Sequence, residues 1–579
     1  MEITGAELFV KALIKEHVDT LFAYPGGQAI DLFDALYGVP DINVILPRHE
    51  QGLAHAADGY ARATGKPGVC LVTSGPGATN LVTGIATANF DSVPMVCFTG
   101  QVPMHLIGND AFQEADIVGI TRNITKWSVT VKKREDLGTI IKKAFYVATT
   151  GKPGVVVVDL PKNIQVASGS DEYPEDIEIR SYKPNTEVHI GQVKRAMRIM
   201  KKAEKPLFLL GGGVNIAGAG DDMVILAEKT RIPVVTTIMG KGAIPTDHEL
   251  YVGNVGIHGC YAANKAVSEC DVLVSIGTRF SDRITGKIEE YAKNAKIIHV
   301  DIDTAAISRN IEVDIPIVGD ARIAIRMLTE YVPRLDTDEW RLVIEKWDKE
   351  HPLTASAPGV GASSKEVSPY DIIKEINTRF SEAIITTDVG QNQMWTTQYI
   401  ELTKGKKLLT SGGLGTMGYG LPAAIGAKIG CPDKPVISIN GDGGVQMCIQ
   451  ELATAVVYSL PVIICVLNNG YLGNVRQWQE LFYNRHYSST CLRRRPGCPL
   501  TCDRPKEDCP AYTPDFIRLA ESYGAKAIRV TRSDEIADAF EQALGETEVP
   551  TLIEFVIGRE DEVLPMVPPG RTLDDVIIG

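Results

Sequence analysis

A carboxylate and an amide stand at matching places in the last third of the chain. Asp442 follows the apolar string VISIN, and Asn469 follows the apolar string PVIICVL. The segment between them carries apolar residues at helical spacing, which predicts a strand–helix–strand unit with both strand ends at one sheet edge. Carboxylate and amide oxygens meeting there suit a hard divalent cation that bridges phosphate oxygens, with glycine amides and a helix N-terminus holding negative charge. The alternative is a solvated turn with a capping asparagine.

A second candidate is Glu50, which opens an alanine-rich helix in the string RHEQGLAHAADGYARATGKPG. In an apolar pocket, a glutamate can share a proton with the ring nitrogen of a ligand. From its position alone, a glutamate at a helix start is equally well a helix cap. Two glycine strings, YPGG and SGPGATN, end strands and would let a ligand approach the backbone, although the second is also an ordinary tight turn.

Four cysteines cluster in the string CLRRRPGCPLTCDRPKEDC: Cys491, Cys498, Cys502 and Cys509. Clustered thiols can bind zinc or an iron–sulfur cluster, but the spacing C-x6-C-x3-C-x6-C matches no common knuckle. The alternatives are redox-active or disulfide-bonded cysteines, and free thiols. We expect this insertion, at about 490–511, to lie close to an active-site lid.

The elements that must position these residues alternate between short apolar strands and helices, which predicts an α/β fold with parallel sheets. Three such units are separated by linkers, the first polar and proline-bearing, the second rich in Ala, Gly, Pro and Ser. The units are 1–165, 190–335 and 368–558, followed by a C-terminal tail at 559–579 that could fold over a site.

Length and composition agree with this division. A chain of 579 residues should hold about three to four domains. Its net charge of −13, without a basic stripe, argues against nucleic acid as a partner. No apolar stretch approaches a membrane span, and the amphipathic start, predicted as a helix over 1–17, lacks the features of a signal peptide. We therefore expect a cytoplasmic enzyme.

The motifs together carry a family resemblance. YPGG, RHEQGLAHAADGYARATGKPG, SGPGATNLVTGIATA, NDAFQEADIVGITRNITKWS and VDLPKN follow one another in the family's order and spacing. Over nearly its whole length the chain resembles the catalytic subunits of the acetohydroxyacid synthases, which are thiamine-diphosphate enzymes. The resemblance implies a pyrimidine-binding first domain, a central FAD-binding domain, and a third domain that binds the diphosphate and magnesium.

The resemblance also assigns roles to residues of the thiamine site. Glu50 would hydrogen-bond the pyrimidine ring and favour its imino tautomer, whose nitrogen is the internal base. The catalytic residues implied are Glu50, Gly27, Gln113 and Lys162. The cofactor contacts implied are Tyr24, Pro25, Gly26, Met417, Gly441, Gly443 and Gly444. Asp442, Asn469 and the Tyr471 carbonyl would bind Mg²⁺.

From the residues alone, evidence for a flavin is weak, because the acid at the end of VDID lies far beyond the roughly twenty residues of a Rossmann fingerprint. The resemblance nevertheless implies FAD in the central unit, with a structural role. The residues implied are Gly212, Gly213, Gly277, Arg279, Asp282, Arg283, Asp301, Asp320 and Ala321. The chain departs from the family pattern at Ser281, where an acid is usual, and this removes one flavin contact.

The activity implied is decarboxylation of pyruvate and transfer of the two-carbon unit to a second pyruvate or to 2-oxobutanoate, the first common step of branched-chain amino-acid biosynthesis. Phe112, Arg283 and Trp478 would contact substrate, and Trp478 would favour 2-oxobutanoate. Asn474, where relatives have Met or Leu, leaves that preference open. Rival functions on the same scaffold are pyruvate oxidase, sulfoacetaldehyde acetyltransferase and glyoxylate carboligase, although the last lacks the activating glutamate.

A non-catalytic binding protein is the rival from another class, and intact Glu50, Asp442 and Asn469 argue against it. The family's cofactor lies between two subunits, so the resemblance implies a homodimer as the smallest active unit, or a homotetramer. A separate small regulatory subunit is the other partner that it implies.

Overall fold

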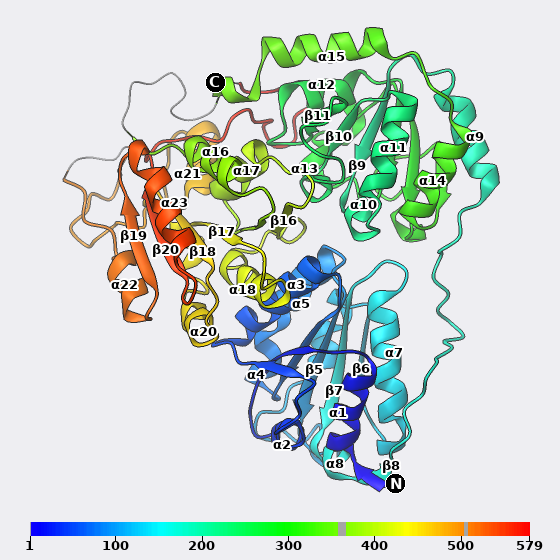
Figure 1. Cartoon of the computed structure of the whole chain (residues 1–579), viewed down its shortest axis with the longest axis vertical. Coiled ribbons are helices and arrows are strands. Elements are labelled where there is room, and N and C mark those ends of the chain that lie inside the picture. Colours follow the sequence, from blue (N-terminus) through cyan, green and yellow to red (C-terminus); the bar gives the residue numbers. More distant parts are fainter. Residues whose placement is uncertain (1, 357–365, 503–507, 579) are drawn as a thin grey trace.

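Three parallel six-stranded sheets form the frame of the molecule (Figure 1). The computed structural model describes residues 2–356, 366–502 and 508–578. Part of the second predicted linker, 357–365, and part of the cysteine-rich insertion, 503–507, lie outside the described residues. The predicted α/β class with three parallel sheets is confirmed.

The first sheet has the strand order β3-β2-β4-β5-β7-β6 and lies at the bottom of Figure 1. Its strands are β2 (Thr20–Tyr24), β3 (Asn43–Ile45), β4 (Gly68–Val72), β5 (Met95–Gln101), β6 (Trp127–Thr130) and β7 (Val155–Pro161). Its helices are α1 (Gly5–Lys15), α2 (Ile30–Leu36), α3 (Glu50–Thr64), α4 (Pro76–Asn80), α5 (Val82–Phe90), α6 (Ile117–Thr121), α7 (Leu137–Thr149) and α8 (Lys162–Val166). Alternate valines of β7 enter two separate cores, one on each face of the sheet, which explains its uninterrupted apolar run.

The predicted N-terminal helix begins later than the amphipathic pattern suggested. Residues Glu2–Thr4 form β1, which pairs antiparallel with β8 (Ser168–Ser170) at the end of the first unit. Thr4 then caps α1 in a capping box with Glu7. A long extended connection leaves β8 and runs along the outside of the molecule to the central unit (Figure 1).

The central sheet has the order β11-β10-β9-β12-β13-β14. Its strands are β9 (Pro206–Leu210), β10 (Val234–Thr236), β11 (Tyr251–Asn254), β12 (Val272–Ile276), β13 (Lys296–Asp301) and β14 (Ile315–Val318). Its helices are α9 (Ile190–Met200), α10 (Gly212–Ile216), α11 (Gly220–Thr230), α12 (Tyr261–Glu269), α13 (Asp282–Thr285), α14 (Ala321–Tyr331) and α15 (Asp338–Glu350). Buried clusters again lie on both faces of this sheet.

The third sheet has the order β16-β15-β17-β18-β20-β19. Its strands are β15 (Ile384–Thr387), β16 (Lys407–Thr410), β17 (Val436–Gly441), β18 (Ile463–Asn468), β19 (Lys526–Val530) and β20 (Thr551–Val556). Its helices are α16 (Pro369–Arg379), α17 (Gln391–Tyr399), α18 (Gly420–Gly430), α19 (Asp442–Val445), α20 (Glu451–Val457), α21 (Gly473–Phe482), α22 (Phe516–Ser522) and α23 (Ile536–Gly545). The strand–helix–strand unit predicted around Asp442 is therefore present as β17, α20 and β18.

The first and third units meet where α3 crosses α18 (Figure 1). Gly59 of α3 lies against the backbone of Ala423, and Gly426 of α18 lies against the backbone of Ala56. A methyl group at either glycine would overlap the facing carbonyl oxygen, so the two helices touch at their backbones.

A buried ion-pair network reinforces this contact. Arg62 of α3 pairs with Asp58 at 2.7 Å and with Asp91 at 3.0 Å, and all three side chains are almost fully buried. Tyr419 donates a hydrogen bond to Asp58 from the start of α18 (2.6 Å). Because an unpaired charge at this depth is costly, the network fixes how the two units sit against each other.

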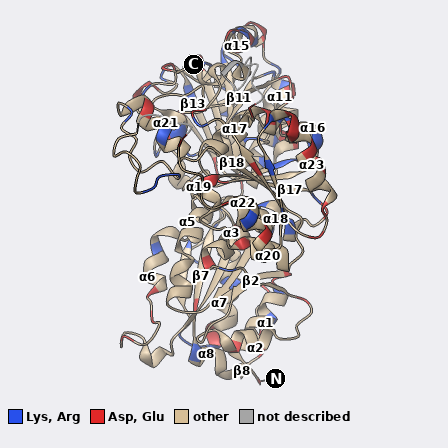
Figure 2. Cartoon of the chain, turned by 90° about the vertical axis from the view of Figure 1, so that its left-hand side faces the viewer, with Lys and Arg blue, Asp and Glu red and all other residues tan. Residues whose placement is uncertain are grey.

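The C-terminal tail crosses from the third unit to the central unit. The amide of Val563 donates to the side chain of Gln477 on α21 (3.0 Å), and the amide of Val567 donates to the carbonyl of Ile257 (2.8 Å). Positively and negatively charged residues are interspersed along the ribbon in Figure 2. In the part of the chain that the structure describes, no helix has the length and apolar character needed to cross a bilayer.

Candidate active site

Asp442 and Asn469 lie close together at the carboxyl edge of the third sheet. Asp442 is the first residue after β17, Asn469 is the first after β18, and these strands pair in parallel. The amide of Gly470 donates to the Asp442 carboxylate (3.1 Å), and the amide of Tyr471 donates to the Asn469 side-chain oxygen (3.0 Å). We call Asn469–Leu472 the metal loop.

A cavity of about 250 Å³ opens beside the metal loop, and we call it the metal cavity. All of the residues predicted for the diphosphate and metal end of the thiamine site line it: Met417, Gly441, Asp442, Gly443, Gly444, Asn469 and Tyr471. Sequence reasoning missed further lining residues, namely Gly390, Gln391, Asn392 and Gly415. A signal was present for Gln391 and Asn392, because they follow the end of β15, whose carboxyl end lies at the same sheet edge.

The donor atoms in this cavity fit a divalent cation. Asp442 is only 2% exposed, and burial raises the pKa of its carboxyl to about 7. Among the residues described, no basic side chain pairs with it, and no backbone amide donates to the Tyr471 carbonyl. A buried carboxylate without a cationic partner, beside an amide oxygen and an uncommitted carbonyl, is the kind of oxygen set that Mg²⁺ uses.

Glu50 lies in the first unit, and the structure shows whether it caps α3 or turns its carboxylate elsewhere. The side chain that caps α3 is His49, which accepts a hydrogen bond from the amide of Gln51 (3.0 Å). The Glu50 carboxylate instead accepts from Asn80 of the glycine string SGPGATN (2.9 Å). A Cβ at Gly77 would lie 3.4 Å from the other carboxylate oxygen. Glu50 is therefore not the cap, and it faces a glycine turn.

Other predicted residues of the first unit lie on loops or, for Lys162, at the start of α8. Lys162 donates to the Gly27 carbonyl (3.1 Å) and pairs with Asp31 (2.8 Å). Gln113 has a positive φ of 60° and packs against the Gly75 turn, while Phe112 is 85% exposed.

Every residue that lines the metal cavity belongs to the third unit. The structure thus brings the predicted thiamine-site residues together in two separate groups, one in the first unit and one in the third. Within the described chain, no residue of the first group lines the metal cavity.

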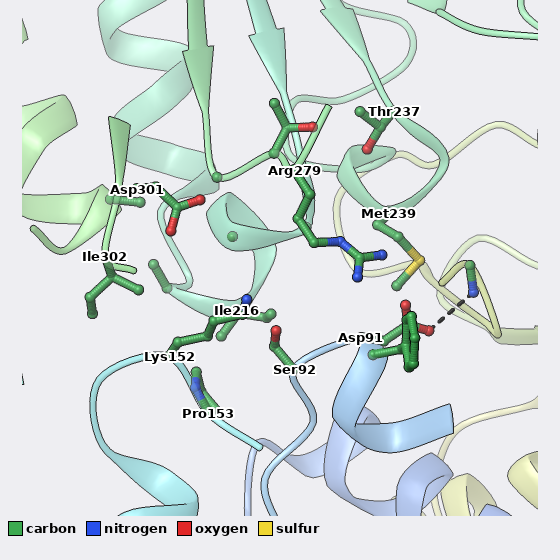
Figure 3. Close-up of a pocket in the computed structure, with 18 of the residues that line it drawn as sticks. Asp91, Ser92, Lys152, Pro153, Ile216, Thr237, Met239, Arg279, Asp301 and Ile302 are labelled. Atoms are coloured by element: carbon green, nitrogen blue, oxygen red, sulfur yellow. Dashed lines mark hydrogen bonds between the residues drawn. The ribbon is translucent and has the colours of Figure 1, made fainter. Parts of the chain in front are cut away.

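A second cavity of about 300 Å³ lies where the central unit meets the other two, and we call it the flavin cavity (Figure 3). It is lined by eight of the nine residues predicted for FAD: Gly212, Gly213, Gly277, Arg279, Arg283, Asp301, Asp320 and Ala321. The ninth, Asp282, does not line it; its side chain is 77% exposed and lies 3.5 Å from Arg283.

Glycines shape the floor of the flavin cavity. Gly213 follows β9 and Gly277 follows the paired strand β12, and the Gly213 amide donates to the Gly277 carbonyl (3.0 Å). Gly277 has a φ of 63°, and a Cβ there would lie 2.6 Å from the Gly213 Cα. Side chains are excluded at this point, which leaves room for an extended ligand to lie on the backbone.

The walls of the flavin cavity come from other units, and sequence reasoning missed them. Asp91, Ser92 and Lys152 belong to the first unit, and Asp91 accepts a hydrogen bond from the amide of Gly412 in the third unit (3.0 Å; Figure 3). Burial raises the pKa of Asp301, at the end of β13, to about 6.

Arg283 of the flavin cavity contacts Trp478 of α21. The Arg283 guanidinium lies 5.8 Å from the centre of the Trp478 ring, and Arg283 itself lines the flavin cavity. Trp478 stands on α21, whose first turn carries Asn474 in the lining of the metal cavity. Within the described chain, the Trp478 indole N–H and the Asn474 side-chain oxygen are buried without a hydrogen-bond partner, so a ligand could meet them.

The four clustered cysteines do not form a metal centre in the part of the chain that the structure describes. No group of three or more His, Cys, Asp or Glu side chains with metal-binding geometry occurs there. Cys491 instead forms an antiparallel bridge with Tyr471, and Cys498 accepts a hydrogen bond from the amide of Arg495 (3.3 Å). This bridge places Cys491 of the insertion against the metal loop, while the predicted position of the insertion close to an active-site lid stays a prediction.

Three family models match successive parts of the chain. They are described as the N-terminal TPP binding domain, the central domain and the C-terminal TPP binding domain of thiamine pyrophosphate enzymes. They cover residues 3–120, 193–328 and 388–555 respectively.

Curated relatives match the chain from end to end. A probable acetolactate synthase large subunit of Methanocaldococcus jannaschii is 47% identical, over 99% of this chain and 95% of the relative. The acetolactate synthase large subunit of Corynebacterium glutamicum is 43% identical, over 99% of this chain and 90% of the relative. The acetolactate synthase isozyme 3 large subunit of Escherichia coli is 41% identical, over 99% and 98%. The chain therefore belongs to the thiamine pyrophosphate enzymes and, among them, to the acetolactate synthase large subunits.

Proposed function

We propose that this chain catalyses the acetolactate synthase reaction, in which pyruvate loses carbon dioxide and its two-carbon remainder is joined to a second pyruvate or to 2-oxobutanoate. The observation that carries the proposal is the set of oxygen donors at the metal cavity. These donors occur in a chain that matches acetolactate synthase large subunits over nearly its full length. Thiamine diphosphate, when bound, supplies the nucleophilic carbon and stabilises the negative charge left by decarboxylation.

The residues of the metal cavity would hold the diphosphate through Mg²⁺. Asp442, the Asn469 amide oxygen and the Tyr471 carbonyl are its protein ligands in this proposal. The cation resolves the energetic problem of Asp442, because it compensates a carboxylate that burial otherwise disfavours. Gly443, Gly444 and Met417 line the same cavity, where the two glycines would let phosphate oxygens approach the backbone and Met417 would support the cofactor.

Glu50 would act on the pyrimidine ring. Its carboxylate would accept or give a proton at the ring nitrogen while Asn80 holds its second oxygen in place. Glu50 belongs to the first unit and the metal cavity to the third, and we propose that a complete site joins Glu50 of one subunit to the metal cavity of a partner. A homodimer is then the smallest active form, and a tetramer of two such dimers is compatible with it.

Acceptor selection would fall to residues around Trp478. The Arg283 guanidinium fits two oxygens of a 2-oxoacid carboxylate, and the Trp478 ring bounds the space for the alkyl group. Gln113 and the exposed Phe112 would approach from the partner's first unit, with Lys162 at the entrance.

FAD would occupy the flavin cavity in a structural role, because the reaction has no net redox change. The glycine floor and Arg279, Asp301 and Asp320 support this assignment by their place in the cavity. The names of the relatives, which call them large subunits, support a separate small regulatory subunit as a further partner.

The test is acetolactate formed from pyruvate by the purified chain with Mg²⁺, thiamine diphosphate and FAD. We expect product from the wild type and a loss of about 10²–10⁴-fold for Glu50→Gln, the range typical of a positioned acid–base group. Oxygen uptake and acetate-level products without acetolactate would instead indicate a pyruvate oxidase. Acetyl transfer to phosphate from sulfoacetaldehyde would indicate the acetyltransferase.

A further inference from the structure

The cysteine-rich insertion is attached to the metal loop by its backbone. The amide of Leu472 donates to the Thr490 carbonyl (2.8 Å), and the amide of Leu492 donates to the Gly470 carbonyl (2.9 Å). These two bonds flank the bridge between Tyr471 and Cys491. Tyr471 and Cys491 thus form a non-hydrogen-bonded antiparallel pair, in which the two opposite residues make no backbone hydrogen bonds to each other. The insertion therefore holds the loop while the Tyr471 carbonyl keeps no hydrogen-bond donor.

Tyr512, the first residue after the insertion, lies at the same site. Its hydroxyl lies beside the Asp442 carboxylate, where its interaction with that carboxylate opposes the rise in the Asp442 pKa that burial causes. Gln446 donates to the hydroxyl oxygen of Tyr512 (2.9 Å) and to the backbone carbonyl of Asp442 (2.8 Å). Because the amide of Gln446 occupies the acceptor side of the hydroxyl, the single hydroxyl proton is left for another acceptor, and we infer that this acceptor is the neighbouring Asp442 carboxylate.

The ring of Tyr512 is itself held in place. It stacks on Phe516 with ring centres 5.6 Å apart and an interplanar angle of 28°. Phe516 opens α22 and is fully buried in the core of the third unit. The hydroxyl is therefore fixed at one end by a rigid hydrophobic contact and at the other by Gln446.

We propose that Tyr512 is a positioning residue for Asp442, the carboxylate that would bind the metal. The insertion and Tyr512 together would hold the Tyr471 carbonyl and Asp442 in the geometry that the metal needs. The inference rests on the proposed role of Asp442 as a metal ligand. A second shell of this kind orients a ligand oxygen before the cation arrives, so its loss weakens metal binding without removing a ligand. The insertion would thereby act in the chemistry of the site, although its described residues form no metal centre of their own.

The test is Mn²⁺ affinity of the full-length protein with thiamine diphosphate, read from the electron paramagnetic resonance signal of free Mn²⁺. Tyr512→Phe keeps the ring on Phe516 and removes only the hydroxyl, and we expect Mn²⁺ to bind about 10–100-fold more weakly. Gln446→Met should weaken binding by a smaller factor, because it frees the hydroxyl to rotate. The matched control is Tyr523→Phe at the end of α22, whose hydroxyl makes no hydrogen bond among the described residues, and it should bind as the wild type does.

Two comparisons keep the inference falsifiable. Asp442→Ala should abolish Mn²⁺ binding; if it binds as the wild type does, the proposed metal site itself is wrong, and the role of Tyr512 falls with it. If Asp442→Ala loses the metal but Tyr512→Phe binds normally, the metal site stands and the clamp alone is wrong. A purely structural role would lower the unfolding midpoint of the metal-free Tyr512→Phe protein, whereas a positioning role leaves that midpoint close to the wild type.

Discussion

The flavin cavity and the metal cavity are built in opposite ways. The flavin cavity takes its floor from the central unit and its walls from the first and third units, so one chain encloses it. The metal cavity is lined by the third unit alone, and the catalytic residues predicted for it lie in the first unit, outside its lining. Packing within one chain completes the flavin cavity. The metal cavity has donor atoms from the third unit only, so a surface from another unit or subunit is needed to complete it.

The buried acids of the two cavities also differ, in whether a basic side chain lies near them. Asp301 in the flavin cavity has Lys152 nearby, whose charge partly offsets the effect of burial on the Asp301 pKa. Asp442 has no basic partner among the described side chains, and its pKa is raised further, to about 7. The flavin cavity therefore carries its own charge compensation, and the metal cavity depends on what binds there.

Mixing two inactive subunits should show whether a partner completes the metal cavity. Glu50→Gln and Asp442→Ala should each be nearly inactive alone. If each thiamine site joins two subunits, a mixed dimer contains one doubly defective site and one intact site, and co-expression should restore about a quarter of wild-type acetolactate formation.

The control for mixing is each variant expressed alone with the same two affinity tags. Activity that stays at the level of the single variants in purified mixed dimers would mean that every subunit carries its own complete site. In that case the separation of the two groups within the chain would be a feature of an open state of one subunit.

Trp478 offers the next largest effect. Trp478→Leu should lower the preference for 2-oxobutanoate over pyruvate as acceptor by about 10–200-fold, because the ring that bounds the alkyl group is lost. Competition between the two acceptors measures the ratio. Phe482→Leu, at the other end of α21, is the matched control and should leave the ratio unchanged. Equal ratios in all three proteins would place acceptor selection elsewhere.

Asp301 makes the electrostatic part of the comparison testable by pH. Its folded-state pKa of about 6 lies above the ordinary 3.8, so the stability contributed by its protonated form is complete below pH 3.8 and is lost as pH rises to 6. Asp301→Asn stays neutral, and the flavin-free variant should gain up to about 3 kcal/mol over the wild type above pH 6. Urea unfolding at pH 4 and pH 7.5 measures this, and an equal gain at both values would contradict it.

Arg279 gives the smallest expected effect and the cleanest separation of the two cavities. Arg279→Ala removes a charged donor from the flavin cavity and its contact with the Phe90 ring, so FAD should bind about tenfold more weakly. Mn²⁺ affinity should not change. Quenching of flavin fluorescence follows the first quantity, and Arg309→Ala, an exposed arginine outside both cavities, is the control. A parallel loss of Mn²⁺ would mean that the cavities are coupled.

What could be predicted from the sequence follows the range of the interactions involved. Asp442 and Asn469 were found because one strand–helix–strand unit fixes both, and parallel pairing brings its two strand ends together. The meeting of Gly213 and Gly277 could be predicted because both follow strands that pair, and their role toward FAD stays a prediction from family strings. Gln391 could have been found by the same rule, since it follows β15.

Other residues of the sites carried no such local signal. Asp91 and Gly412 meet only because the first and third units pack against each other, and that packing depends on contacts between distant segments. Tyr512 was missed because it directly follows the insertion, where neither periodicity nor a family string constrains it. Asp282 was predicted from its string, but α13 turns its carboxylate outward.

The crossing of α3 and α18 limits how this molecule can be recombined with its relatives. At Gly59 and at Gly426, a carbonyl of the facing helix occupies the space that a side chain would need. The two helix surfaces therefore fit each other so closely that one added methyl group would not be tolerated. A chimera that takes its first domain from one parent and its third from another would join surfaces shaped separately. Crossover points that keep both helices from a single parent should give folded hybrids, and those that part them should yield chains that aggregate.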